Sequence, residues 1–136
     1  SNRNVKVIKD ETYSLLSNSK AALVTSGTAT LETAIFKIPQ VVCYKTSAIS
    51  YFLAKIFVKI KFISLVNLIM NEEIIKELIQ DNCSKKNIVK ELKKVLDLKN
   101  RNKLLDKYEK LISLLGTSGS SNRLAKDIVL KNEFWK

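Results

Sequence analysis

The sequence predicts an α/β fold in which a Rossmann-like parallel sheet is layered with helices. In the first half of the chain, short apolar runs alternate with helix-type patterns, which is typical of the units that build parallel sheets. The chain has 136 residues, of which 46% are hydrophobic and 27% are charged, and it contains one proline. This length and composition fit one compact domain with a buried core, and two full domains would not fit.

The first half is expected to run strand, helix, strand, helix, strand, at residues 5–8, 11–18, 22–25, 28–37 and 40–44. Leu31, Ala34 and Ile35 recur at helical spacing in the second helix. Pro39 disfavours the helical conformation at Ile38, so the helix ends there and a strand follows. Such a strand-turn-helix-strand unit builds doubly wound sheets with right-handed crossovers.

The second half is expected to be mainly helical. Residues 47–59 read as a helix with Ser47 or Ser50 as its cap, followed by a short strand at residues 62–65. The next helix is predicted from Leu68 or Glu72 to Gln80. A loop at residues 81–84 should cap a further helix, and the last two helices are expected at residues 100–115 and 120–130. The helix after the loop carries an apolar stripe of Ile88, Val89, Leu92, Val95 and Leu96.

The composition excludes several kinds of catalysis. The chain contains no histidine, which rules out catalytic triads, histidine bases and histidine-ligated metals within it. Its two cysteines, Cys43 and Cys83, have neither metal-site spacing nor a disulfide-dense pattern. The sequence therefore predicts no metal, no cofactor and a reducing compartment, which favours the cytoplasm.

The net charge of +11 predicts attraction to a polyanion. Residues 84–110 carry a net +6, but these charges surround apolar stripes as solvated helix faces do. A nucleic-acid-binding module is an alternative function, although no binding motif supports it, and a nucleic-acid partner is not expected. Residues 51–62, YFLAKIFVKIKF, could lie on an anionic membrane surface or pack as a helix on the sheet.

The stretch LVTSGTATLE is typical of a phosphate-binding turn. Gly27 lets the backbone approach a ligand, and the free N–H groups of the following helix favour negative charge. Ser26, Thr28 and Thr30 add hydroxyl donors, while Glu32, about one turn inside the helix, suits a sugar diol. The alternative is that Thr28 merely caps the helix and Glu32 supports the cap and the dipole. The pattern matches neither GxGxxG nor a Walker A loop.

The elements SGTATLE, PQVVCYK, LAK, SL-N and ELIQ occur in this order within residues 22–80. This run closely resembles the C-terminal half of the lipid-A-disaccharide synthases, which are bacterial inverting glycosyltransferases of the GT-B fold. The resemblance implies the donor-binding half of that fold, with extra C-terminal helices. It also implies transfer of 2,3-diacylglucosamine from UDP-2,3-diacylglucosamine to 2,3-diacylglucosamine 1-phosphate, without a metal. Another UDP-sugar enzyme of the GT-B fold is the alternative.

Site residues carry over from the resemblance by position. It places Ser26, Gly27, Thr28 and Ala29 around the UDP diphosphate and Glu32 at the ribose hydroxyls. It also places Tyr44, Lys45 and Asn67 at the donor pocket, with Thr30, Glu77 and Gln80 as further candidates, the last two of which could equally be solvated helix residues. The sequence departs from the family at Lys45, where arginine is usual, at Val66, where proline is usual, and at residues 70–72, which replace a Gly-Arg pair.

The resemblance makes residues 3–136 a C-terminal nucleotide-sugar-binding domain, with Ser1 and Asn2 as a cloning remnant. The acceptor domain is then a missing N-terminal domain, and the catalytic residues, which are unknown, are expected there. Residues 120–136, with Phe134 and Trp135, either expose apolar surface or pack in the core. The expected partners are a UDP-diacylglucosamine donor and a lipid acceptor, with self-association left open. The expected location is the cytoplasm, with peripheral attachment to the inner face of the inner membrane as an alternative.

Overall fold

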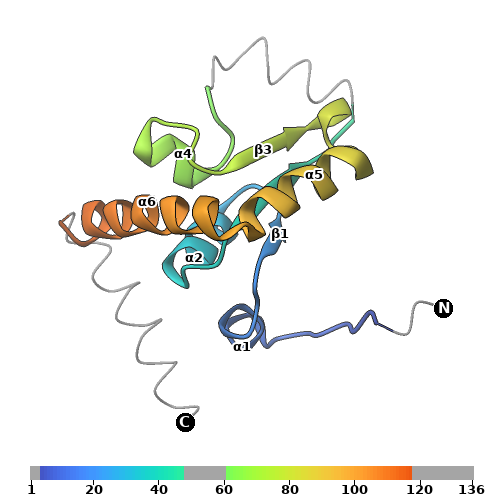
Figure 1. Cartoon of the computed structure of the whole chain (residues 1–136), viewed down its shortest axis with the longest axis horizontal. Coiled ribbons are helices and arrows are strands. Elements are labelled where there is room, and N and C mark those ends of the chain that lie inside the picture. Colours follow the sequence, from blue (N-terminus) through green and yellow to red (C-terminus); the bar gives the residue numbers. More distant parts are fainter. Residues whose placement is uncertain (1–3, 48–60, 118–136) are drawn as a thin grey trace.

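The computed structural model describes residues 4–47 and 61–117 (Figure 1). Its elements in chain order are α1 (Thr12–Ser17), β1 (Ala22–Val24), α2 (Thr28–Ile35), β2 (Gln40–Tyr44), α4 (Leu65–Met70), β3 (Lys76–Ile79), the short 3-10 helix η1 (Gln80–Asn82), α5 (Lys85–Leu96) and α6 (Leu98–Thr117). The helices predicted at residues 47–59 and 120–130, and the apolar surface predicted around Phe134 and Trp135, lie outside the described residues.

The three strands form one parallel sheet in the order β1-β2-β3. Val24 pairs with Val42 and Tyr44 pairs with Ile79, so the carboxyl ends of all three strands lie at one edge of the sheet. No described residue pairs with the outer edge of β1. The expectation of an α/β, Rossmann-like fold is confirmed, and the carboxyl edge is where such sheets bind ligands.

Helices cover the sheet because both of its faces are apolar. Side chains alternate along β2, which places Val42 and Tyr44 on one face and Val41 and Cys43 on the other. The Val42 face carries the main core, whose buried members come from β2, from α2, α4 and α6, and from the residue before β3: Ala34, Val42, Val66, Ile75, Leu104, Tyr108 and Leu111. Val41 is buried as well, and α5 packs against β2 and β3.

The strand-turn-helix-strand unit of the first half is confirmed. The predicted helix at residues 11–18 is α1, the predicted strands at residues 22–25 and 40–44 are β1 and β2, and the predicted helix at residues 28–37 is α2. Lys37, which follows α2, has a left-handed backbone with φ of 57° and donates its N–H to Ala34. The helix therefore ends just before Pro39, as the sequence predicts.

The strand predicted at residues 5–8 is wrong. These residues form no strand, and Val5 and Val7 are 74% and 81% exposed. Figure 1 shows the stretch before α1 running away from the sheet. An extended segment becomes a stable strand only when a neighbouring strand satisfies its backbone, and no described residue does so here.

Both elements predicted between residues 62 and 80 are also wrong. Instead of a strand, Ser64 caps α4, its hydroxyl accepting from the Asn67 N–H at 3.3 Å. Asn71 then ends α4 in the left-handed conformation, and β3 replaces the predicted helix. The apolar run around Ile75 fits a helix or a buried strand equally well, and pairing with β2 decides for the strand.

The last part of the described chain follows the prediction more closely. The short helix η1 overlaps the start of the loop predicted at residues 81–84, and the Ser84 hydroxyl caps α5 by accepting from the Asn87 N–H. Val89 and Leu96, predicted in the apolar stripe of α5, are exposed instead. Helix α6 contains the predicted helix at residues 100–115 and continues to Thr117.

Candidate functional site

Three segments that are distant in the sequence meet at the carboxyl edge of the sheet. The turn of residues 25–27 follows β1, residues 45–47 follow β2, and Gln80 follows β3. The parallel register places these strand ends side by side. The edge therefore brings together the two sequence motifs predicted to bind the donor.

The turn between β1 and α2 requires glycine for its backbone. Gly27 has φ of 114° and ψ of −160°, a region that other residues essentially never occupy. A Cβ atom at this position would meet no atom of the described residues within 4 Å, so backbone conformation, and not space, demands the glycine. Gly27 is also the N-cap of α2, and no side chain in the described part of the chain caps the helix.

The N-terminus of α2 presents unpaired donors. The backbone N–H groups of Gly27, Thr28 and Ala29 have no partner among the described residues, whereas that of Thr30 bonds to the Gly27 carbonyl at 3.2 Å. Free N–H groups and the helix dipole together favour an anion. The alternative in which Thr28 caps the helix is wrong, because Thr28 is the first helical residue and its hydroxyl bonds to no described group.

Glu32 lies one turn into α2 and is half-buried. No described residue hydrogen-bonds or pairs with its carboxylate, so this side chain is free to accept bonds from a ligand. It lines an open cavity of about 310 Å³ between α1, β1 and α2, whose walls are mostly apolar. Leu15, Leu16, Leu23 and Val24 contribute to these walls.

Lys45 and Tyr44 lie at the end of β2. The Lys45 side chain is exposed, Tyr44 is half-buried, and neither side chain bonds to a described residue. The following residue, Thr46, is held by Gln80: its N–H donates to Gln80 Oε1 at 2.9 Å, and its carbonyl accepts from Gln80 Nε2 at 3.0 Å. A cationic side chain is thus presented on a fixed backbone at the carboxyl edge of the sheet.

Thr30 serves the fold. Its side chain is buried, and its hydroxyl donates to the Gly27 carbonyl at 2.7 Å, which secures the turn that it was expected to line. Its own carbonyl accepts from Gln40 Nε2 at 2.9 Å. These contacts make Thr30 a support for the turn, and they use its hydroxyl proton, its N–H and its carbonyl within the protein.

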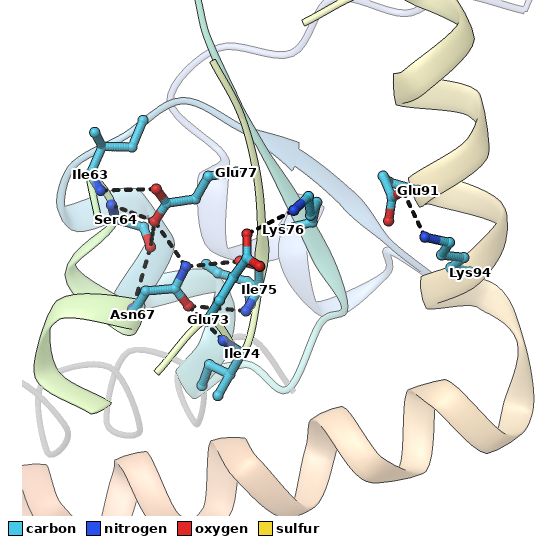
Figure 2. Close-up of polar contacts among 10 residues, drawn as sticks. All are labelled: Ile63, Ser64, Asn67, Glu73, Ile74, Ile75, Lys76, Glu77, Glu91 and Lys94. Carbon is cyan, nitrogen blue, oxygen red and sulfur yellow. Dashed lines mark hydrogen bonds and ion pairs between the residues drawn. The ribbon is translucent and has the colours of Figure 1, made fainter. Parts of the chain in front are cut away.

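Asn67 and Glu77 are joined in an internal network (Figure 2). Asn67 is fully buried; its Nδ2 donates to the Ile75 carbonyl and to Glu77 Oε1, and its Oδ1 accepts from the backbone of Ile74 and Ile75. The Glu77 carboxylate also accepts from the N–H of Ile63 and from the N–H and hydroxyl of Ser64. The alternative in which Glu77 is a solvated helix residue is wrong, because Glu77 lies on β3 and its carboxylate bonds to the start of α4.

The predicted site residues therefore divide into two groups. Side chains without a described partner are those of Ser26, Thr28, Glu32, Tyr44 and Lys45, and the backbone N–H groups of Gly27 and Ala29 are also unpaired among the described residues. Engaged side chains are those of Thr30, Asn67, Glu77 and Gln80. Ligand contact stays a prediction for both groups, and the geometry favours the first.

Sequence reasoning missed Gln40, whose side chain bonds to the backbone of α2. This fully buried residue starts β2, donates to the Thr30 carbonyl, and also donates to the Tyr108 hydroxyl at 3.2 Å. Burial raises the pKa of Tyr108, so its hydroxyl stays protonated. The signal available in the sequence was a polar side chain at the start of an otherwise apolar strand, directly after Pro39.

Cys43 lies on β2 close to Cys83. Burial, together with the neighbouring Cys83 thiol, raises the pKa of Cys43 to about 11. The neutral thiol is a poor nucleophile, so the structure gives Cys43 a packing role. Within residues 4–47 and 61–117, no three His, Cys, Asp or Glu side chains are grouped to hold a metal ion, and no helix is long and apolar enough to cross a membrane.

Comparison with known proteins points to one family. A family model described as lipid-A-disaccharide synthetase matches residues 1–130. A lipid-A-disaccharide synthase of Psychromonas ingrahamii is 42% identical over 92 residues, covering 68% of this chain and 24% of the relative. Those of Vibrio campbellii and a Sulfurihydrogenibium species are both 36% identical, over 78% and 90% of this chain and 28% and 32% of their own lengths. The chain thus spans about a quarter to a third of these relatives.

Proposed function

Because the chain belongs to the lipid-A-disaccharide synthase family, we propose that it supplies the UDP-binding part of such an enzyme. The whole enzyme would transfer 2,3-diacylglucosamine from UDP-2,3-diacylglucosamine to 2,3-diacylglucosamine 1-phosphate. Residues 3–136 would belong to its C-terminal nucleotide-sugar-binding domain.

The observation that carries this proposal is the set of free groups at the carboxyl edge of the sheet. Unpaired N–H groups at residues 27–29 and the cationic, exposed Lys45 follow adjacent strands. A diphosphate needs donors and positive charge, and both are present here without a protein partner among the described residues.

Glu32 would recognise the nucleoside. A carboxylate accepts hydrogen bonds and repels phosphate, so a position one turn beyond the phosphate-binding N–H groups suits a ribose diol. The half-buried, unpartnered Glu32 is at that position. Ser26 and Thr28 would add hydroxyl donors at the turn.

The acceptor and the catalytic groups would belong to the remainder of the enzyme. The chain covers 24–32% of the relatives named above, and several large apolar side chains within residues 5–23 are exposed. We assign this apolar surface to contact with the rest of the enzyme. Reaction at the cytoplasmic face of the inner membrane would suit lipid substrates and the net charge of +11.

Titration of the 136-residue chain with UDP, followed by two-dimensional NMR, tests the proposal. We expect weak, saturable binding with shifts confined to residues 25–32 and 44–46, because one side of a two-sided cleft is present. Lys45→Ala should weaken binding, while Lys99→Ala, which removes an exposed lysine from α6, should not. Shifts spread over α5 and α6, lost equally in both variants, would indicate unspecific attraction to basic surface and contradict the proposal.

A further inference from the structure

We propose that Gln80 is a positioning residue of the donor site, which it serves by fixing the backbone that carries Lys45. The proposal rests on the proposed function and extends it to a residue whose side-chain amide bonds to the protein backbone through both its oxygen and its nitrogen. Both polar atoms of the Gln80 side-chain amide are used on Thr46. Gln80 therefore acts on the site through the segment after β2.

The two bonds extend the parallel ladder beyond its last backbone pair. Regular pairing of β2 with β3 ends at Tyr44 and Ile79. Two residues later, the N–H and the carbonyl of Thr46 are both satisfied by one side-chain amide, at 2.9 and 3.0 Å, as a neighbouring strand would satisfy them. Lys45 is thereby held on both sides, between the last ladder residue and the clamped one.

Gln80 makes this contact while its own backbone is in the left-handed conformation. Gln80 has φ of 50°, a left-handed conformation that is costly for a residue other than glycine, asparagine or aspartate. Such strain persists where surrounding contacts over-determine the conformation, and it gathers at functional sites. Here the left-handed residue follows the last residue of β3, starts η1 and makes the side-chain contact to Thr46.

Glu77, on β3 itself, makes a comparable contact with a separate segment. Glu77 bonds to the backbone N–H groups of Ile63 and Ser64 at 2.9 and 3.0 Å. The two contacts hold different segments. Glu77 also bonds to Asn67 inside the core network. Gln80 instead holds Thr46, and the residue just before Thr46 is Lys45, whose exposed side chain has no partner among the described residues. Only the second contact is placed to affect a ligand at the edge.

The consequence is preorganisation of Lys45. If the backbone at residues 45–46 were free, binding a diphosphate would have to order it, and the ordering of one residue weakens affinity about fivefold. Removing the Gln80 clamp should therefore weaken UDP binding by about this factor, although Gln80 itself contacts no phosphate.

Two variants remove the clamp without adding strain. Gln80→Asn keeps an amide and tolerates the left-handed backbone, but it is one methylene too short; Gln80→Gly removes the side chain and relaxes the backbone. Lys37→Gly is the matched control, because Lys37 has a similar φ of 57° at the far end of α2, away from the site. We expect the Thr46 amide to exchange about tenfold faster with solvent in both Gln80 variants and at an unchanged rate in Lys37→Gly.

A double-mutant cycle in the full chain separates positioning from general stability. Gln80→Asn should weaken UDP binding about fivefold in the native background and in Glu32→Gln, but less than twofold in Lys45→Ala, because the clamp acts through Lys45. Equal losses in the native and Lys45→Ala backgrounds, or unchanged exchange at Thr46, would overturn the positioning role. Failure of the unmodified chain to bind UDP, or unchanged binding in both Lys45→Ala and Glu32→Gln, would instead overturn the proposed function on which it rests.

Discussion

At the scale of single residues, the site depends on groups that the fold leaves unused. Gly27 contributes a backbone that only glycine adopts, and Glu32 and Lys45 contribute charged groups with no described partner. An unpaired charge or donor is tolerated where water or a ligand can reach it. The residues that we propose to bind the ligand are therefore those whose polar groups have no partner among the described residues.

We expect Gly27→Ala to lower the free energy of unfolding by about 1 to 3 kcal/mol, because alanine is strained at φ of 114°. Urea denaturation measures this change. Gly116→Ala is the control, since Gly116 lies in the exposed end of α6, where an added Cβ meets no atom within 4 Å. That substitution should stabilise the chain by about 0.5 to 1 kcal/mol, and similar losses at both glycines would contradict the assigned strain.

Glu32→Gln should weaken UDP binding about tenfold and leave inorganic diphosphate binding unchanged. Charge-assisted hydrogen bonds to a ribose diol are worth roughly 1.5 to 3 kcal/mol each, and glutamine keeps the size while weakening them. Calorimetry with both ligands makes the comparison. Because no described group bonds to this carboxylate, thermal stability should not change; a loss of stability with full UDP affinity would exclude the ribose role.

We expect the free energy of unfolding to fall at alkaline pH because of the Cys43 thiol. Its pKa is raised from 9.0 to about 11 in the folded chain, so the folded state keeps a proton that the unfolded state releases. The contribution of Cys43 is then full below pH 9 and is lost as the pH rises towards 11. Alkylation by iodoacetamide, followed by peptide mapping, should show the rate at Cys43 still rising above pH 10; a plateau near pH 9 would contradict the shift.

At the scale of elements, β3 organises what surrounds the site. Its Glu77 side chain bonds to the start of α4, and its backbone completes the sheet beside β2. Gln80, which follows its last residue, bonds to Thr46. Helix α4 is six residues long, too short to be stable without such contacts. The hydrogen bonds of Asn67 and Glu77 therefore stabilise α4, which is too short to be stable alone.

Asn67→Ala should destabilise the chain by about 2 to 4 kcal/mol. The substitution removes the Asn67 amide oxygen from the buried Ile75 N–H, and it takes one of two acceptors from the Ile74 N–H and one of four donors from the Glu77 carboxylate. Asn102→Ala, on the exposed face of α6, is the matched control and should be neutral or slightly stabilising. Weaker UDP binding at unchanged stability would instead show that Asn67 contacts the donor.

At the scale of the whole molecule, charge and exposed apolar surface govern association. The net charge of +11 acts at long range, while the apolar side chains exposed within residues 5–23 act only on contact. At the start of the second described range, Lys61 Nζ lies 5.2 Å from the centre of the Phe62 ring. The rest of the segment predicted to meet a membrane, residues 51–60, lies outside the described residues.

Binding of the chain to lipid vesicles should require anionic lipid and fade with salt. Attraction through lysine is screened beyond about 8 Å at physiological ionic strength, so raising the salt concentration should release the chain. Co-sedimentation with vesicles containing phosphatidylglycerol, against vesicles of phosphatidylcholine alone, measures the difference. Equal binding to both kinds of vesicle would show that apolar contact, and not charge, drives attachment.

The sequence by itself determined the unit from β1 to β2 and the turn within it. Strand, turn and helix signals lie within a few residues of one another there, and Gly27 and Pro39 mark the turn and the helix end locally. The predicted ligand groups of this unit, Ser26 to Ala29 and Glu32, are accordingly placed by local backbone geometry. Thr30, in the same unit, is different, because its hydroxyl is taken by the turn.

Only the tertiary structure decided the nature of β3 and the roles of its residues. The pattern around Ile75 suits a helix or a buried strand, and the choice depends on backbone bonds to β2, more than thirty residues earlier in the chain. Asn67, Glu77 and Gln80 are polar residues whose partners come from other segments, so no local pattern separates a ligand contact from a structural one. Hydrogen bonds between distant segments form only once the chain has folded, which is why position alone could not assign these three residues.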